Sequence, residues 1–171
     1  LLAGQHAHPL NYGNIPNATC CHPEVASIGL TEEQCKEKKL DYQVGRFPFS
    51  ANGRARASNE TEGFVKIIRE KKYGEILGAH IVGGHASEMI HELAVARENE
   101  YTVEEVDLAV HAHPTLSEAI AEAALAVVQV KRHGSAEDDQ PANERHDQRV
   151  AQDIGHLFGK RKLHGTIQNT V

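Results

Sequence analysis

The sequence lacks the features that mark several large classes of protein. It contains no run of about 18 apolar residues, so we expect no membrane-spanning helix. Its formal net charge of −6 provides no basic surface of the kind that nucleic-acid binding requires. The apolar start Leu1-Leu2-Ala3 is too short for a secretory signal peptide. These absences argue against a membrane protein, a nucleic-acid-binding protein and a secreted protein.

Cofactor and disulfide motifs are missing as well. No Gly-x-Gly-x-x-Gly occurs, so the sequence carries no dinucleotide-binding fingerprint. The three cysteines are Cys20, Cys21 and Cys35, and an odd number does not suggest a disulfide framework. We expect buried or half-buried free thiols, because free cysteine behaves as a small hydrophobe. Free thiols indicate a reducing compartment.

The residues that are present indicate a globular domain with an appendage. The chain has 171 residues, of which 40% are hydrophobic and 25% are charged, and these are ordinary globular values. Turn signals and β-forming residues predict strands at 19–21, 24–29, 42–47, 63–70 and 75–82, the last two as a hairpin. Apolar periodicity predicts a helix over 86–100. Residues 50–58 are either a short helical turn or a loop.

Two helix starts are marked by capping boxes. Thr31 and Gln34 begin a helix that we expect to stop near Leu40, and Thr102 and Glu105 begin another, short helix. In the first helix, Glu32 and Lys36 have the spacing of an ion pair.

A histidine motif at residues 111–118 (HAHPTLSE) carries the clearest chemistry. His113 directly precedes Pro114, and Glu118 follows His113 by five residues. Histidine changes charge near neutral pH, and a carboxylate can orient its ring and stabilise the imidazolium, so the two residues could form a proton-transfer pair. Thr115-x-x-Glu118 is also a capping box. From the residues alone, both interpretations stay open.

Twelve histidines raise the question of a zinc site. His85 and His91 are six residues apart, which places them on different faces of a helix. No Cys-x2-Cys or His-x3-His pair completes a tetrahedral site. We therefore expect no metal site.

The histidine motif resembles the signature of the dihydrolipoyl dehydrogenase family, which belongs to the pyridine nucleotide–disulfide oxidoreductases. Residues 21–32 (CHPEVASIGLTE) and 78–88 (GAHIVGGHASE) are similar to earlier parts of the family's interface domain, in the same order. The resemblance implies an α+β fold, a mostly antiparallel sheet covered by helices. It implies a connection from a missing FAD domain at 1–18 and the dimerisation domain at 19–128.

The resemblance also implies a function that is shared between subunits. His113 would be the base that takes a thiol proton in NAD-dependent oxidation of dihydrolipoamide, and Glu118 would orient it. The pair would face the partner's FAD and redox disulfide, with a cis His113–Pro114 bond and the main chain of Pro114 toward the flavin. His111 would be a neighbour of the site, with a structural role at least as well supported.

The remaining expectations concern partners and location. The chain has no Cys-x4-Cys spacing for a redox disulfide, so the FAD domain, the NAD domain and that disulfide would lie on other sequence of the parent enzyme. Alone, this chain is expected to be inactive and to bind no cofactor. Expected partners are a second copy and the lipoyl domains of 2-oxoacid dehydrogenase complexes, in bacterial cytoplasm or mitochondrial matrix. The alternatives are a dimerisation module without activity and the same domain of another flavin disulfide reductase.

The last two predictions concern the final helix and the tail. An apolar stripe follows the histidine motif and predicts a helix. The stripe consists of Leu116, Ala119, Ile120, Ala123, Ala124 and Val127. The helix lies either against its own sheet or, as the resemblance suggests, in the dimer interface. Residues 129–171 are a polar tail that we expect to be flexible. Within the tail, the spacing from Val150 to Phe158 allows a short amphipathic helix.

Overall fold

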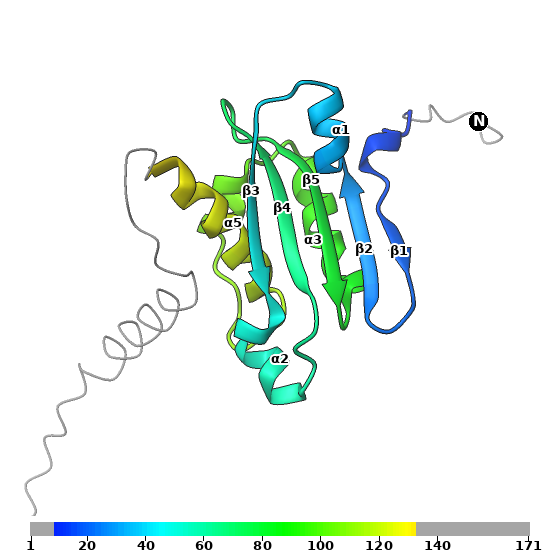
Figure 1. Ribbon diagram of the computed structural model, residues 1–171, viewed down its shortest axis with the longest axis vertical. Coiled ribbons are helices and arrows are strands. Elements are labelled where there is room, and N and C mark those ends of the chain that lie inside the picture. The colour runs from blue at the N-terminus through cyan, green and yellow to red at the C-terminus, as the bar shows by residue number, and fades with distance from the viewer. Residues whose placement is uncertain (1–8, 133–171) are drawn as a thin grey trace, which may run out of the picture. The chain divides into compact units, whose positions relative to one another are not determined.

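An antiparallel five-stranded sheet is the centre of the computed structural model, which describes residues 9–132. The strand order is β1-β2-β5-β4-β3, and every neighbouring pair is antiparallel (Figure 1). The strands are β1 (Asn17–Thr19), β2 (Glu24–Gly29), β3 (Tyr42–Pro48), β4 (Phe64–Glu70) and β5 (Ile76–Gly83). The predicted fold class, α+β with a mostly antiparallel sheet, is confirmed.

The predicted hairpin is formed by β4 and β5. Gly74 in its turn has φ +86°, a conformation that glycine adopts without steric cost. A register shift between Ile68 and Arg69 interrupts the ladder. Arg69 is fully buried, and its guanidinium donates to the Glu104 carboxylate and to the Lys71 carbonyl. Because a buried charge requires partners, this arginine ties the hairpin to the helix that contains Glu104.

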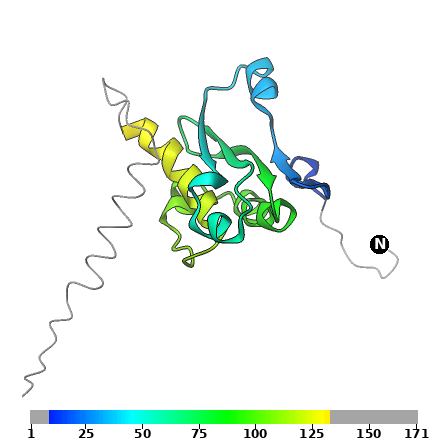
Figure 2. The same ribbon diagram turned by 60° about the horizontal axis from the view of Figure 1, so that its bottom comes forward.

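Two helices cover one face of the sheet. α3 (Ala86–Glu98) lies against β2 and β5, and α5 (Glu118–Arg132) lies against β3 and β4. Figure 2 shows both helices on the same side of the strands. The main core lies between these helices and the sheet, and its largest fully buried side chains are Phe47, Phe49, Ile28, Ile67, Ile76, Ile81, Ile90, Leu93, Ile120 and Val65.

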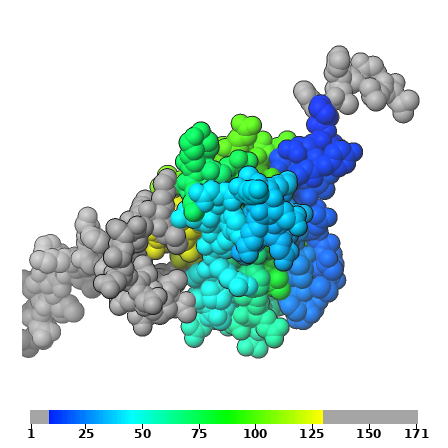
Figure 3. All heavy atoms as spheres, turned by 45° about the horizontal axis from the view of Figure 1, so that its top comes forward, coloured from blue at the N-terminus to red at the C-terminus, as the bar shows by residue number. Residues whose placement is uncertain are grey.

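The opposite face carries α1 (Glu32–Glu37) over a second, smaller core around Cys35, Ile68 and Leu77. The predicted capping box of Thr31 and Gln34 is present. The expected Glu32–Lys36 pair is not the contact that the structure shows. Instead, Glu32 accepts a hydrogen bond from Lys66 of β4 at 2.9 Å, so this carboxylate fastens α1 to the sheet. Figure 3 shows the α1 end of the molecule beside the N-terminal described residues.

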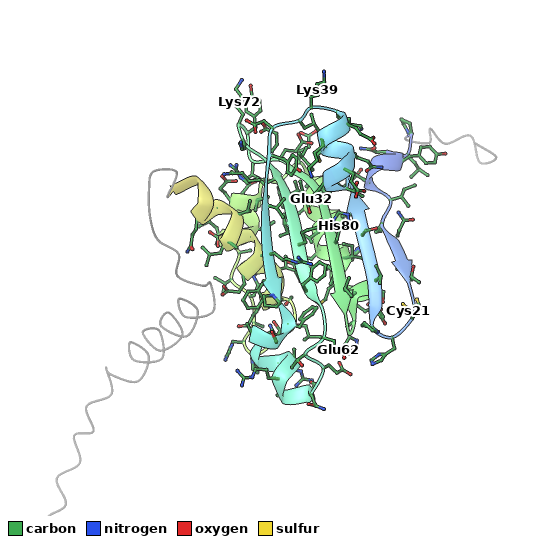
Figure 4. All side chains as sticks on the ribbon, viewed as in Figure 1. Cys21, Glu32, Lys39, Glu62, Lys72 and His80 are labelled. Atoms are coloured by element: carbon green, nitrogen blue, oxygen red, sulfur yellow. The ribbon has the colours of Figure 1, made fainter. Side chains whose placement is uncertain are left out.

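The first strand lies two residues earlier than predicted. β1 ends at Thr19, so Cys20 and Cys21 fall in the connection to β2, at the end of the sheet away from α1 (Figure 4). Both thiols are exposed, and only Cys35 is buried. The expectation of buried or half-buried thiols is therefore wrong for Cys20 and Cys21.

Short helices complete the domain. The ambiguous segment 50–58 is helical, with η2 (Phe49–Ala51) followed by α2 (Gly53–Ser58). η1 (Tyr12–Asn14) precedes the sheet, and α4 (Val103–Leu108) has the predicted capping box of Thr102 and Glu105. On α3, the Arg97 guanidinium donates to the Ile76 and Leu77 carbonyls, so it links α3 to β5.

The apolar stripe of α5 is buried within this chain. Ala119, Ile120, Ala123, Ala124 and Val127 are each 0% exposed. A methyl group added at Gly45 of β3 would lie 2.1 Å from the Ala123 carbonyl oxygen, so the helix touches the strand backbone. The interpretation of a helix against its own sheet is confirmed. The alternative, a place for this helix in the dimer interface, stays a prediction.

Two predictions fall outside the described residues. These are the start of the expected connection, residues 1–8, and the polar tail from residue 133 with its possible helix over 150–158.

Candidate active site

The histidine motif lies in the segment that joins α4 to α5. α4 ends at Leu108, its C-cap Ala109 is extended, and α5 begins at Glu118. We call residues 109–117 the histidine loop. The residue before a proline is disfavoured from the helical region, which agrees with a loop around Pro114, and the His113–Pro114 peptide is cis, as the resemblance predicted.

The structure brings His113 and Glu118 together. Nδ1 of His113 lies 2.7 Å from Oε1 of Glu118. The His113 side chain is 62% exposed and the Glu118 side chain 20%, so the ring stands out from the surface and the carboxylate lies behind it. An ionised carboxylate only accepts hydrogen bonds. The proton in this contact is therefore on Nδ1, and Nε2 is the nitrogen of the neutral ring that can take up another proton.

Glu118 makes a contact that each of the two interpretations of its sequence position requires. While Oε1 contacts His113, Oε2 accepts from the Thr115 backbone N–H at 2.8 Å, which is the glutamate half of a capping box. Thr115 Oγ1 donates instead to the Ala112 carbonyl at 2.7 Å. The capping and the proton-transfer interpretations are therefore compatible, because each uses a different oxygen of the carboxylate.

His111 contacts a helix of the domain rather than its neighbour His113. Its Nε2 lies 2.8 Å from Oε1 of Glu92 on α3, and its Nδ1 lies 2.9 Å from the Ala109 carbonyl. The hydrogen bond to Glu92 raises the pKa of His111 above its usual value, against the effect of burial, which lowers it. His111 therefore lies two residues before His113 and is hydrogen-bonded to α3.

Sequence reasoning missed Asn52, which holds the other end of the histidine loop. This side chain is only 3% exposed. Its amide nitrogen donates to the Thr115 carbonyl at 3.0 Å, and its oxygen accepts from the Ala55 N–H and caps α2. Asparagine before a helix is a usual cap, which is the one signal that the sequence offered. The contact with Thr115, 63 residues away, has no local signature.

Three further histidines of the described residues lie on or beside β5 and α3. His80 is on β5 and points to the same face as Glu32 of α1 (Figure 4). Burial lowers the pKa of His80. His85 precedes α3 with φ +61°, and His91 is exposed on that helix. Among residues 9–132, no group of three His, Cys, Asp or Glu side chains is placed to hold a metal ion.

Within the described range 9–132, no helix combines the length and the apolar content that crossing a bilayer demands.

The fold and the histidine loop match one family. The model of the pyridine nucleotide-disulphide oxidoreductase dimerisation domain matches residues 15–124, and the chain belongs to this family. The relatives that it resembles are dihydrolipoyl dehydrogenases, a narrower group within this family. The chain is 52% identical over 126 residues to dihydrolipoyl dehydrogenase of Corynebacterium glutamicum, covering 72% of this chain and 27% of that protein. It is 50% identical over 125 residues to the mitochondrial enzyme of Pisum sativum, covering 73% and 25%.

Solved structures agree with the sequence comparison. LpdA from Mycobacterium tuberculosis superposes with a TM-score of 0.68 at 30% identity, covering 72% of this chain and 27% of that one. The HOCl-induced flavoprotein disulfide reductase RclA from Escherichia coli, as a Cu(II) complex, gives 0.64 at 29% identity, covering 66% and 25%. This chain is thus a dimerisation domain of the dihydrolipoyl dehydrogenase-like flavin disulfide oxidoreductases. It spans about a quarter of the length of the curated relatives it matches.

Proposed function

We propose that this domain completes the active site of a second subunit in a dihydrolipoyl dehydrogenase, with His113 as the acid/base and Glu118 as the residue that orients it. The observation that carries the proposal is the 2.7 Å contact between the two side chains on a loop from which His113 projects. An exposed imidazole that is already oriented within its own chain can act on a group that another chain supplies.

The chemistry requires a proton acceptor. A thiolate, not a thiol, attacks a disulfide, so a dithiol substrate such as dihydrolipoamide must lose a proton at neutral pH. Nε2 of His113 takes that proton, and the resulting imidazolium is stabilised by the Glu118 carboxylate on Nδ1. In the reverse direction the same nitrogen returns the proton to the leaving sulfur.

The cofactor of the family is FAD, which when bound passes the electron pair from the dithiol to NAD. The residues of the histidine loop fit a role beside such a ring system rather than around it. Ala112, His113 and Pro114 are all exposed, so their main chain is open to a flat aromatic group. We assign the main chain of Pro114 and the His113 ring to the side that faces the partner's flavin.

A homodimer supplies the second chain. The family's domain is a dimerisation domain. Leu108, just before the histidine loop, is 79% exposed, and Val110, within it, is 99% exposed. Exposed large apolar side chains next to a functional loop are typical of an interaction surface. The lipoyl domains of 2-oxoacid dehydrogenase complexes are the further partners, in bacterial cytoplasm or mitochondrial matrix.

The test is His113→Gln in the full-length enzyme. Glutamine keeps a polar side chain but cannot act as a base near neutral pH, so lipoamide turnover should fall about 10²- to 10⁴-fold, the usual contribution of a positioned acid/base. His91→Gln, on the exposed surface of α3, is the matched control and should keep normal turnover. Dimerisation, measured by sedimentation, should persist in both variants. Normal turnover in His113→Gln would contradict the proposal.

A second candidate is a dimerisation module without chemistry of its own. It is favoured by the residues of this chain, which hold neither a dinucleotide fingerprint nor a Cys-x4-Cys pair. Purified alone, the chain should be colourless and inactive. Visible absorbance tests this expectation, since bound flavin would contradict it.

Another reductase of the family is the third candidate, because one relative at 49% identity is leghemoglobin reductase of Glycine max. Comparing the turnover of the full-length enzyme with lipoamide and with glutathione distinguishes a dihydrolipoyl dehydrogenase from another reductase.

A further inference from the structure

We propose that His111 is a positioning residue, which as an imidazolium clamps the histidine loop to α3 and so fixes the place of His113. The inference deepens the proposed function, since it rests on His113 as the acid/base. It assigns no contact with substrate to His111.

The burial pattern of the loop singles out one side chain. From Leu108 to Pro114 every residue is exposed except His111, whose side chain is 9% exposed. His111 is thus the only residue of this stretch that enters the body of the domain, and it lies two positions before His113. A displacement of its ring would move the backbone that leads directly to the catalytic imidazole.

The two partners of His111 require both of its ring protons. Nδ1 faces the Ala109 carbonyl at 2.9 Å, and Nε2 faces a Glu92 carboxylate oxygen at 2.8 Å. A carbonyl and an ionised carboxylate are both acceptors only, and a neutral imidazole carries a single N–H. Only the imidazolium can donate to both, so the geometry selects the charged ring.

The charges around His111 favour the same form. Glu92 on α3 and Glu118 on α5 are the acidic groups that raise the pKa of His111, with the hydrogen bond to Glu92 the largest cause. Burial opposes them. The pKa of His111 is higher in the folded chain than in the unfolded chain. The contact with Glu92 therefore stabilises the fold fully when the pH is below the unfolded-state pKa of His111. This stabilisation is lost as the pH rises through the folded-state pKa.

The second anchor of the loop does not titrate. Asn52 holds the Thr115 carbonyl at 3.0 Å whatever the pH, because an amide carries no charge. Deprotonation of His111 therefore loosens one end of the loop while the other stays fixed. The expected result is a shift of His113, not unfolding of the domain.

The first experiment is an NMR titration of the imidazole nitrogens in the 171-residue chain. His111 should remain doubly protonated to a clearly higher pH than a free histidine imidazole, and its signals should vanish in His111→Gln, which assigns them. Glu92→Gln should move the His111 titration back toward that of the free imidazole. A His111 ring that titrates with the free imidazole, or below it, would overturn the clamp, and this readout does not depend on the role of His113.

The second experiment measures turnover in the full-length enzyme. His111→Gln should lower kcat about ten- to a hundredfold, the scale of a small misplacement of a catalytic group, with little change in KM. Glu92→Gln should retain most activity below neutral pH and lose it earlier than wild type as pH rises. Unchanged kcat and pH profile in both variants would refute the positioning role. A normal His113→Gln enzyme would instead refute the proposed function, so the two failures are distinguishable.

Discussion

A single carboxylate determines the tautomer of the proposed base. Glu118 accepts from His113 Nδ1 and from the Thr115 N–H, so it has two donors and needs two acceptor oxygens. A glutamine at this position could accept from Thr115 only by turning its NH₂ toward Nδ1. The ring would then carry its proton on Nε2, and the nitrogen assigned as the base would be blocked.

We therefore predict that Glu118→Gln lowers turnover in the full-length enzyme by several orders of magnitude, because a wrongly protonated histidine in a triad costs about 10⁴-fold. Its melting temperature should stay close to that of wild type, since the helix cap is kept. Glu118→Ala should lose turnover and some stability as well. Turnover of Glu118→Gln within tenfold of wild type would show that tautomer control is unimportant here.

At the scale of residues, the sequence indicated contacts only between side chains that lie close together in the chain. His113, Thr115 and Glu118 lie within six residues, so the sequence suggested a His113–Glu118 pair and a capping box. The Thr115 hydroxyl instead donates to the Ala112 carbonyl, which the spacing did not indicate. The partners of His111 and of the buried Asn52 are 19 and 63 residues away, and such contacts depend on how the sheet places α3 and α2. Pattern reasoning has no access to them.

At the scale of elements, the close contact of α5 with β3 depends on one glycine. A Cβ at Gly45 would lie 2.1 Å from the Ala123 carbonyl oxygen and 2.8 Å from the Val127 nitrogen. These are backbone atoms, which cannot move without shifting the helix. Gly45→Ala should therefore lower the free energy of unfolding by about 1–3 kcal/mol, the usual cost of overpacking.

Gly53→Ala in α2 is the matched control, because a Cβ there meets nothing within 4 Å and alanine is the better helix former. It should be neutral or slightly stabilising. Chemical denaturation of the two variants decides between them, and equal stability would mean that α5 does not press on β3 as described.

The elements themselves were largely readable from the sequence. Capping boxes marked the starts of α1 and α4, and the turn at Gly74 marked the hairpin, because each depends on neighbours in the chain. β1 was placed two residues late, since a three-residue edge strand has too few residues for a periodic pattern. The apolar stripe predicted that α5 lies against the sheet. Its close approach to Gly45 joins two distant segments, and the sequence did not indicate which strand residue the helix would touch.

At the scale of the whole molecule, the proposed homodimer needs an interface beside the histidine loop. Val110 is 99% exposed, and it precedes the clamped His111. We predict that Val110→Glu weakens self-association of the full-length enzyme, because a buried, unpaired charge at an interface is costly. Turnover should fall with dimer content as the protein is diluted. Analytical ultracentrifugation measures the dimer directly.

Tyr73→Glu is the matched control for that measurement. Tyr73 is 72% exposed and lies in the turn of the β4–β5 hairpin, beside Lys72 (Figure 4). Its variant should dimerise as wild type does. If Val110→Glu also sediments as wild type does, the histidine loop lies outside the contact between subunits, and the shared site loses its geometric basis.

The His113–Glu118 contact is made entirely within one chain, and this has a consequence for mixed assemblies. In the proposed homodimer, each protomer would supply a complete proton acceptor to its partner and would use the partner's in return, so the two active sites of a dimer would fail independently. A hybrid that joins a subunit lacking the imidazole to one lacking the redox cysteines would retain one working centre, although neither parent pair has any. Activity that returns when two inactive variants are mixed and form hybrid dimers would therefore support an active site shared between subunits.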